Sequence, residues 1–220
     1  MKESKMKIPL FQNMTEQDIR SALQCVGAFQ KEYKKEEFIL LEEDKVQCVG
    51  CVLEGSIEMM REDVWGNKTV LLTIGRQELF GESFVCGSSM ISSVSFIANE
   101  KTKVLFLPFD RVMHSCSYAC TYHQSLIVNM VRLIAEKNVN LISKIDIMSK
   151  KTLREKIGAY LSMEAGYHNS KYFTIPLGRV QLAEYLCVDR SALTRELNHM
   201  RAEGLIDFEK NTFRILKSFQ

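Results

Sequence analysis

Long hydrophobic runs are missing from this sequence, whose apolar segments extend over only a few residues each. A helix needs roughly 20 consecutive apolar residues to cross a bilayer. The opening letters MKESKMK also lead into no apolar stretch of the kind found in a secretory signal. The sequence therefore predicts no membrane partner, and its 46% hydrophobic and 25% charged residues are typical of a globular protein.

An even, regularly spaced set of cysteines is missing too, since the chain has seven. Small secreted domains usually carry an even number of cysteines that form a disulfide framework. Scattered reduced thiols are instead typical of an intracellular compartment. We therefore expect a cytoplasmic protein, with its cysteines at positions 25, 48, 51, 86, 116, 120 and 187.

A large charge of one sign is also absent, because the net charge of the whole chain is only +2. The distribution of charge is uneven. Residues 150–220 hold 12 Lys and Arg against 8 Asp and Glu, a net charge of +4, and residues 1–149 hold 17 against 19, a net charge of −2. A basic domain is the electrostatic signature of nucleic-acid binding, so such a contact is expected in the C-terminal third.

The first half of the chain has the pattern of an antiparallel roll or sandwich. A short helix capped by Thr15 is predicted first, with Ile19, Leu23 and Val26 on one face. Turn signals then separate short apolar segments, which predict strands at 38–41, 48–53, 56–60, 68–74, 92–98 and 103–107. Many short strands with regular turns are typical of an antiparallel β architecture.

A long helix is predicted from Tyr118 to Met148, a stretch without Pro or Gly. Its apolar residues recur at alternating steps of four and three, which is a heptad repeat. This seam predicts the interface of a two-stranded coiled coil, whose asparagine fixes the register, formed by Ile127, Val131, Ile134, Asn138, Leu141, Ile145 and Met148. The alternative is a stripe that packs on the chain's own core. Met130 and Leu133, beside the seam, are predicted to cover the mouth of the roll.

Residues 150–220 have the pattern of a winged helix-turn-helix. Helices are expected over 152–166, 179–188 and 189–204, and a hairpin follows with its turn at Lys210 and Asn211. The buried side of the two short helices and their flanks is predicted to consist of Leu182, Ala183, Leu186, Val188, Leu193, Leu197, Met200, Leu205 and Ile206.

The last of these helices has a polar outer face. Asp189 is a favourable N-cap, so the residues of the first turn and those one turn later share one side. A helix that enters a major groove by its N-terminus presents such residues to base edges, and an arginine can donate two hydrogen bonds to guanine. The predicted DNA contacts are Arg190, Ser191, Thr194, Arg195 and Asn198, with Arg179 meeting a phosphate. The alternative is a solvated charged face.

These stretches resemble a known family. RVQLAEYLCVDRSALTRELNHMRAEGLI is similar to the helix-turn-helix signature of the Crp/Fnr family of bacterial transcription regulators, and VLEGSIEM and LFGES resemble the glycine-marked turns of its cyclic-nucleotide-binding-type β-roll. The resemblance implies a homodimer that binds a two-fold symmetric operator and responds to an effector in the roll. It also implies guanine contacts for Arg190 and Arg195. Ser191 stands where cyclic-AMP-responsive members have glutamate, so their full operator sequence is not carried over.

An arginine is missing from the predicted sensor. Family members that bind cyclic nucleotides have a Gly-Glu pair and, about eleven residues after the glycine, an arginine that pairs with the phosphate. Gly81 and Glu82 are present, but Ser92 occupies the arginine position, and no Arg occurs between Arg76 and Arg111. Cyclic AMP is therefore not expected as the effector. A polar pocket is predicted instead, with Glu82, Ser83, Ser92, Ser93, Met130 and Leu133, although serines there also suit ordinary turns.

Metal centres lack a complete set of predicted ligands. An iron–sulfur centre needs four suitably placed cysteines, and only Cys25 precedes Cys48. Cys48 and Cys51 would point to opposite faces of a strand, whereas Cys116 and Cys120 would meet on a helix, either as a redox or shared-metal pair or as buried thiols. None of the four histidines is in the roll, which argues against haem and against a cupin-type metal enzyme. No metal or required cofactor is expected.

The sequence thus predicts an α+β protein with a β-roll sensor domain at 1–117, a dimerisation helix at 118–149 and a winged helix-turn-helix at 150–220. We expect an effector-responsive, sequence-specific DNA-binding regulator and no enzyme activity. Its partners would be double-stranded DNA, a second copy of the chain and, for an activator, RNA polymerase. The effector would be a small molecule or a redox signal. The alternatives are a cupin-like metal-dependent enzyme and a ligand-sensing module that does not bind DNA.

Overall fold

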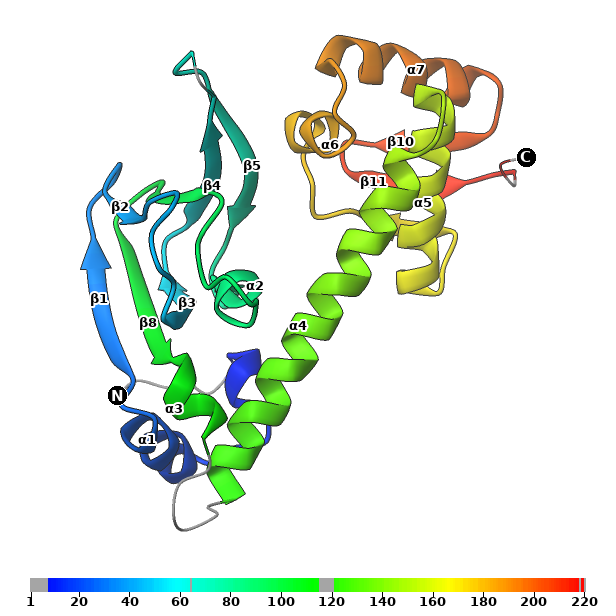
Figure 1. Cartoon of the computed structure of the whole chain (residues 1–220). Helices are drawn as coiled ribbons and strands as arrows, with labels where there is room; N and C mark the ends of the chain where they lie inside the picture. The colour runs from blue at the N-terminus through cyan, green and yellow to red at the C-terminus, as the bar shows by residue number, and fades with distance from the viewer. Residues whose placement is uncertain (1–7, 64, 115–120, 218, 220) are drawn as a thin grey trace. The chain divides into compact units, whose positions relative to one another are not determined.

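The computed structural model describes residues 8–63, 65–114, 121–217 and 219 (Figure 1). The chain divides into two compact units, Met1–Glu136 and Lys137–Gln220. Helix α4 (Thr121–Met148) contributes to both units, so the predicted boundaries at 117 and 149 stay a prediction. None of the helices in the described ranges combines the length and the apolar character that a bilayer crossing requires.

The N-terminal unit begins with the 3-10 turn η2 (Pro9–Phe11) and helix α1 (Glu16–Cys25). The predicted cap is confirmed, because the Thr15 hydroxyl accepts a hydrogen bond from the Asp18 N–H over 3.2 Å. The Asp18 carboxylate in turn accepts from the Thr15 hydroxyl and N–H, which holds the pKa of Asp18 below its usual range. Two orphan amides at the start of α1 are satisfied in this way.

Two antiparallel four-stranded sheets follow among the described residues, in the orders β1-β8-β3-β6 and β2-β7-β4-β5. Their strands are β1 (Phe29–Tyr33), β2 (Phe38–Leu40), β3 (Cys48–Glu54), β4 (Ile57–Glu62), β5 (Lys68–Ile74), β6 (Leu79–Phe80), β7 (Ser95–Ala98) and β8 (Thr102–Pro108). The predicted roll is therefore confirmed. Two of the strands were not predicted: β1 has the polar sequence FQKEY, and β6 has only two residues.

Two apolar clusters hold this unit together. The first joins the two sheets and contains Phe80 and Phe96, whose ring centroids are 5.2 Å apart. The second joins β3 and β8 to α1, to α3 (Phe109–Met113) and to the N-terminal part of α4 through Leu126 and Met130. Almost every residue of β3 is buried, because the two faces of this strand belong to different clusters.

A buried asparagine links α4 to the start of the chain. The side-chain amide of Asn129 donates to the carbonyl oxygens of Leu10, over 3.1 Å, and Gln12, over 2.9 Å. Only 5% of Asn129 is exposed. Both amide hydrogens are therefore satisfied inside the core, as burial of a polar group requires.

The C-terminal unit has the predicted winged helix-turn-helix order. After α4 come α5 (Leu153–His168), β9 (Tyr172–Thr174), α6 (Arg179–Tyr185), α7 (Arg190–Ala202), β10 (Ile206–Glu209) and β11 (Thr212–Ile215). The three strands form an antiparallel sheet in the order β10-β11-β9. The side chains predicted for the core are buried, apart from Val188 and Leu205, which are partly buried against it.

The end of α5 differs from its prediction. The helix passes Gly166 and continues to His168, where Asn169 adopts the left-handed conformation with φ of 46°. The Ser170 N–H then donates to the Ala165 carbonyl over 3.1 Å, the closing bond of a Schellman motif. Gly158, earlier in the helix, leaves space for the ring of Phe219, because a Cβ there would lie only 3.1 Å from Cγ of Phe219.

Candidate nucleic-acid interface

The turn between α6 and α7 fixes the position of α7. Cys187 adopts φ of 53°, a left-handed conformation that lets the Val188 N–H donate to the Ala183 carbonyl over 3.0 Å. Ala183 itself is buried and belongs to the apolar cluster that α6 and α7 share. The predicted helix over 179–188 is shorter in the structure, where α6 ends at Tyr185. The left-handed Cys187 was not predicted, because cysteine has no particular preference for this conformation.

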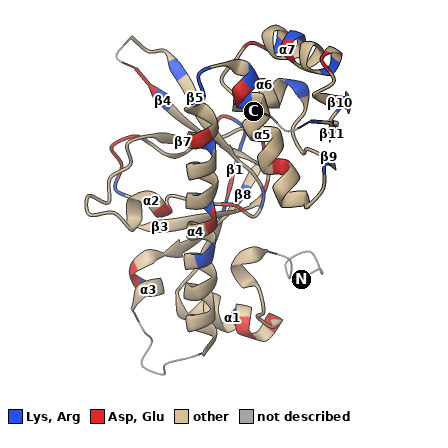
Figure 2. Cartoon of the chain, turned by 90° about the vertical axis from the view of Figure 1, so that its right-hand side faces the viewer, with Lys and Arg blue, Asp and Glu red and all other residues tan. Residues whose placement is uncertain are grey.

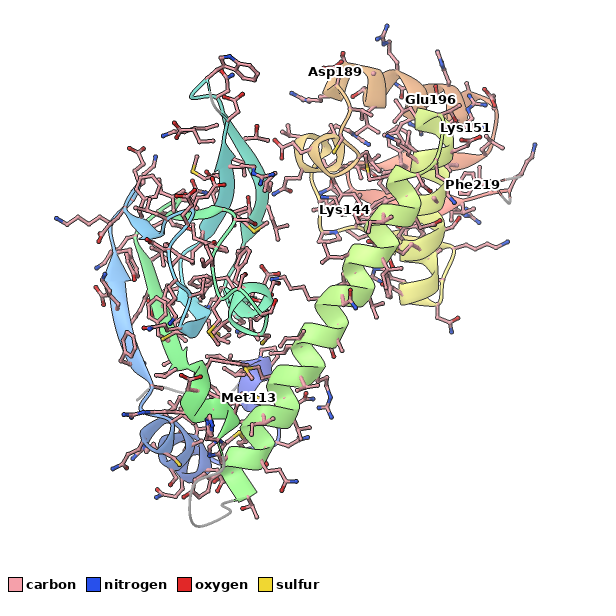
Figure 3. All side chains as sticks on the ribbon, in the orientation of Figure 1. Met113, Lys144, Lys151, Asp189, Glu196 and Phe219 are labelled. Carbon is pink, nitrogen blue, oxygen red and sulfur yellow. The ribbon has the colours of Figure 1, made fainter. Side chains whose placement is uncertain are left out.

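The outer face of α7 carries the residues predicted to contact bases. Leu193, Leu197 and Met200 are fully buried on the inner side. The structure brings the predicted contacts together on the exposed side of the same helix: Arg190, Ser191, Thr194, Arg195 and Asn198. Figure 3 labels Asp189 at the N-terminal end of this helix and Glu196 further along it.

The side chains of Asp189 and Thr194 refine the prediction for this end of α7. Asp189 occupies the N-cap position, but in the part of the chain that the structure describes its carboxylate makes no hydrogen bond to the first-turn amides. The Thr194 hydroxyl donates to the Arg190 carbonyl over 2.8 Å. Thr194 therefore presents its methyl group and an accepting oxygen outward, since its single hydroxyl hydrogen is already used.

Figure 2 shows in blue the positions of the basic residues along α7. Some of these residues are in ion pairs and others are not. Nε of Arg201 lies 2.9 Å from the Asp207 carboxylate, so this arginine is tied to β10. Among the described residues, neither Arg190 nor Arg195 takes part in an ion pair. These two guanidinium groups are therefore available for an external acceptor.

Arg179 contacts the hairpin of β10 and β11, which corresponds to the wing. Its guanidinium lies 5.1 Å from the ring centroid of Phe208 and 5.8 Å from that of Phe213, and it donates to the Lys210 carbonyl over 3.2 Å. Partial burial, with a further contribution from the nearby Arg190 charge, lowers the pKa of Arg179. The predicted phosphate contact is untested, and the structure adds a role in holding the wing against α6.

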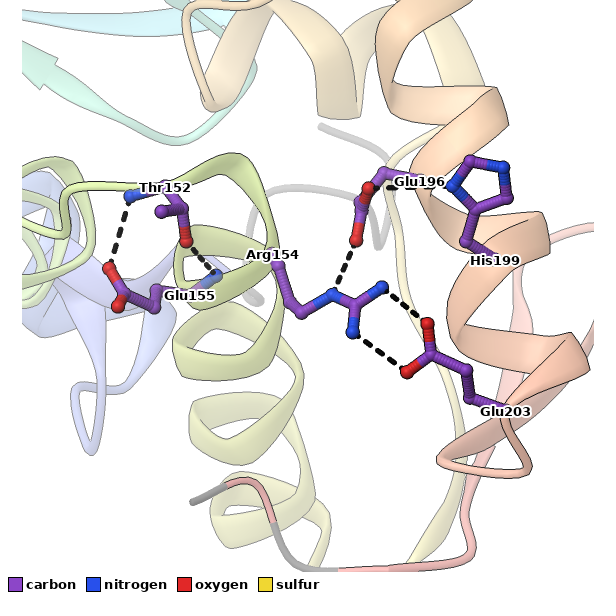
Figure 4. Close-up of polar contacts among 6 residues, drawn as sticks. All are labelled: Thr152, Arg154, Glu155, Glu196, His199 and Glu203. Atoms are coloured by element: carbon purple, nitrogen blue, oxygen red, sulfur yellow. Dashed lines mark hydrogen bonds and ion pairs between the residues drawn. The ribbon is translucent and has the colours of Figure 1, made fainter.

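Arg154, Glu196 and Glu203 form an ion-pair cluster at α7 that was not predicted from the sequence (Figure 4). Arg154, in the first turn of α5, donates from Nε to Glu196 over 2.6 Å and from both Nη atoms to Glu203 over 2.7 Å. These hydrogen bonds lower the pKa of Glu203 and raise that of Arg154. The partners are separated by 42 and 49 residues, so no local pattern could have indicated them.

The residues predicted for the effector pocket have varied surroundings in the N-terminal unit. Glu82 begins the short helix α2 (Glu82–Val85) and is buried, and the Ser92 hydroxyl donates to the Val94 carbonyl of its own turn over 2.6 Å. Ser83 and Ser93 are exposed. Met130 and Leu133 pack against the apolar cluster that contains α1. The Ser92 hydroxyl thus stabilises the turn in which it lies. That these residues line one effector pocket stays a prediction.

The predicted heptad seam on α4 is divided between two environments. Ile127 and Ile134 are partly buried against the core of the N-terminal unit, so the alternative of packing within the chain accounts for part of the stripe. Val131 is 56% exposed and Ile145 is 68% exposed. Other apolar residues along the helix are also exposed, namely Val128, Val139, Leu141 and Ile142, and Met148 is partly exposed. The polar Asn138 of the seam is exposed too.

The cysteines of β3 behave as separate thiols. Cys51 is buried, and burial raises its pKa to about 12. Cys48 is partly buried, and burial raises its pKa too. The pair Cys116 and Cys120 lies outside the described residues. Within the described ranges, no group of three or more His, Cys, Asp or Glu side chains is arranged to hold a metal ion.

Comparison with known proteins gives matches for both units. Residues 30–117 match the family model of the cyclic nucleotide-binding domain, and residues 155–218 match that of the Crp-like helix-turn-helix domain. The transcriptional activator protein FnrA of Stutzerimonas stutzeri is 24% identical over 216 residues, which cover 96% of this chain and 85% of the relative.

Solved structures with a similar fold extend over nearly the whole chain. The catabolite activator protein of Thermus thermophilus has a TM-score of 0.52 and 21% identity, over 94% of this chain and 93% of that one. The c-di-GMP-responsive global regulator CLP of Xanthomonas campestris has a TM-score of 0.59 and 14% identity, over 93% and 100% of the two chains. At such identities the likeness is one of fold.

Proposed function

Because the chain belongs to the Crp/Fnr family of transcription regulators and carries its helix-turn-helix DNA-binding domain, we propose that it acts as a homodimer on a palindromic operator. In this proposal α7 enters the major groove, and an effector bound by the N-terminal unit alters DNA binding. The observation that carries the proposal is the exposed face of α7, where Arg190 and Arg195 have no ion-pair partner among the described residues.

Sequence specificity would come from the N-terminal two turns of α7. Arg190 and Arg195 can each donate two hydrogen bonds to a guanine, and Thr194 offers its methyl group to a thymine because its hydroxyl hydrogen is donated within the helix. Ser191 and Asn198 complete the exposed row. Arg179, at the start of α6, would meet a phosphate with the guanidinium hydrogens that it does not donate to Lys210.

The second copy of the chain would pack along α4. Exposed Val131, Leu141 and Ile145 form an apolar surface on this helix, and an exposed asparagine within it, Asn138, suits a position that sets helix register. A two-fold dimer places two copies of α7 about one helical turn of DNA apart, roughly 34 Å. A palindromic site follows from that symmetry.

The effector proposed here is a small molecule or a redox signal other than cyclic AMP. Ser92 occupies the position of the phosphate-binding arginine, and its hydroxyl is engaged by Val94. Glu82, Ser83 and Ser93 remain the proposed polar contacts, with Met130 and Leu133 as the adjoining apolar ones.

Family membership supports a regulatory role without catalysis or a required cofactor. If the protein activates transcription, it would also contact RNA polymerase. We expect the protein to act in the cytoplasm.

Selection from random DNA duplexes tests the proposal. The purified chain should select a palindrome, protect two half-sites in a footprint and bind as two copies per duplex. Binding should weaken steeply with salt, because phosphate contacts release counterions. Selection of no sequence at low salt would overturn the assignment of α7, whereas selection of a single asymmetric half-site would overturn the homodimer alone.

A further inference from the structure

A cysteine and a histidine from different helices contact each other inside the N-terminal unit. Sγ of Cys25, the last residue of α1, lies 3.7 Å from Nδ1 of His123, in the first turn of α4. The other ring nitrogen, Nε2, lies 2.7 Å from the carbonyl oxygen of Val112 in α3. His123 is only 4% exposed, whereas Cys25 is partly exposed.

The Val112 carbonyl fixes the tautomer of His123. A carbonyl oxygen only accepts, so Nε2 must carry a hydrogen and donate it. In the neutral ring, Nδ1 then has a lone pair, and this lone pair faces Cys25. The thiol donates its hydrogen to Nδ1, which is the arrangement of a nucleophile beside a general base.

We propose that Cys25 is a modification site, a thiol that hydroperoxides oxidise with His123 as the base. The Cys25 proton moves to Nδ1, and the thiolate sulfur attacks one oxygen of hydrogen peroxide. A sulfur–oxygen bond forms as the oxygen–oxygen bond breaks. The departing hydroxide takes the proton back from Nδ1 and leaves as water, so the thiol is oxidised to a sulfenic acid and the peroxide is reduced.

The other described cysteines lack this combination of access and base. Cys51 is buried and Cys48 is partly buried, and burial raises the pKa of both thiols, which disfavours the reactive thiolate. Cys86 and Cys187 are both exposed. Among the described residues, no histidine contacts either of them. Cys25 should therefore be oxidised faster than two thiols that are more exposed to solvent, which accessibility alone would not produce.

The contact also lies at a junction of three helices. Cys25 belongs to α1, Val112 to α3 and His123 to α4, so oxidation of Sγ replaces the hydrogen that the thiol donates across the 3.7 Å contact between α1 and α4. This step rests on the proposed role of α4 as the dimer helix: oxidation of Cys25 would then alter the dimer interface through its contact with α4. The modification itself does not depend on that role and is tested without DNA.

The experiment follows the loss of each thiol in the full chain. The reduced protein is treated with hydrogen peroxide in the presence of a metal chelator, quenched at intervals with an alkylating agent, and digested for mass spectrometry. Alkylation measures the free thiol at Cys25, Cys86 and Cys187, whatever oxidised product forms. Cys25 should be lost at least about tenfold faster than the other two, a threshold set below the roughly 10²- to 10⁴-fold contribution of general-base catalysis. Equal or slower loss would overturn the proposal without any variant.

Two histidine variants separate the base from simple exposure. His123→Gln keeps a nitrogen that can donate to Val112 but removes the lone pair facing Cys25, and it should slow the loss of Cys25 by about tenfold or more. His114→Gln changes an exposed histidine and is the matched control. Rates at Cys86 and Cys187 should stay unchanged in both variants. An unchanged Cys25 rate in a folded His123→Gln chain would show that the imidazole is not the base.

Discussion

Arg154 and Glu203 form a two-point ion pair in which each Nη atom donates to one carboxylate oxygen over 2.7 Å. The remaining donor, Nε, reaches Glu196 over 2.6 Å. One guanidinium thereby holds the carboxylate of Glu196 in α7 and that of Glu203, the C-cap residue of α7, against the first turn of α5. Since Glu196 and Arg195 are neighbours in the chain, this cluster sets the rotation of the helix face proposed to read DNA.

Loss of this guanidinium should lower both stability and operator affinity. Arg154→Ala is expected to lower the Tm by a few degrees, and Arg154→Lys to recover only part, because an ammonium group cannot make the planar two-point contact. Arg20→Ala removes a single exposed ion pair with Glu16, 3.5 Å long, and is the matched control. Thermal unfolding and DNA titration measure the two effects. Equal Tm values for the two alanine variants would contradict the role given to Arg154.

The same cluster predicts a dependence of stability on pH. The hydrogen bonds from Arg154 hold the pKa of Glu203 below its usual range. A carboxyl whose pKa is lower in the folded state stabilises that state above its unfolded pKa, and this contribution is lost as pH falls through the folded pKa. Urea midpoints measured at decreasing pH should fall less steeply in Glu203→Gln than in the unmodified chain. Salt should reduce the difference, because both groups are partly exposed.

Replacement of Arg195 by alanine should remove discrimination between operators. A bidentate contact with guanine contributes about 1 to 3 kcal/mol of preference, while nonspecific binding through phosphates should persist. Arg201→Ala is the control, because Arg201 lies on the same helix but is paired with Asp207. Titrations against the selected duplex and a single-base variant give the preference directly. Retained preference in Arg195→Ala would assign base reading to other residues.

The exposed part of the α4 seam should determine the oligomeric state. Ile145→Glu should weaken dimer formation by at least about tenfold, equivalent to about 1.4 kcal/mol, without unfolding the chain, because the side chain is 68% exposed. Asn138→Ile should maintain or strengthen association but relax its register. Val70→Glu, on an exposed position of β5, is the control. Sedimentation and cysteine cross-linking along α4 measure these effects, and dimers unaffected by Ile145→Glu would locate the interface elsewhere.

Arg179 should matter for the wing as well as for DNA. Arg179→Gln removes the cation over Phe208 and Phe213 and weakens the contact with Lys210. Amide hydrogen exchange in β10 and β11 should become faster, and the salt dependence of DNA binding should decrease by about one phosphate contact. If exchange in the hairpin does not change, Arg179 contributes to phosphate binding alone.

The winged helix-turn-helix was predictable because its local signals agree with one another. The buried stripes, the glycine end of α7 at Gly204 and the turn at Lys210 each follow from a short stretch of sequence. The end of α5 was less predictable, since Gly166 is a helix breaker by composition but Asn169 supplies the left-handed residue. Strand β1 escaped prediction because its apolar signal is weak and its pairing with β8 is distant in sequence.

Contacts between distant segments could not be predicted from local patterns. Neither the cluster around Arg154 nor the contact of Cys25 with His123 has a sequence spacing that indicates it, because the fold alone brings these side chains together. The heptad seam shows that a local pattern can be recognised while its packing partner is not. Its spacing identified a continuous stripe on α4, but not that Ile127 and Ile134 would be partly covered by the chain itself.

The side-chain amide of Asn129 couples the stability of residues 8–14 to that of α4. Its two hydrogens serve the carbonyls of Leu10 and Gln12, 119 and 117 residues earlier in the chain. Any unwinding of α4 near Asn129 must leave both carbonyls without their donor, at a place where water has little access. Protease cleavage near residues 8–14 is therefore a direct reporter of the integrity of a helix that begins more than a hundred residues later.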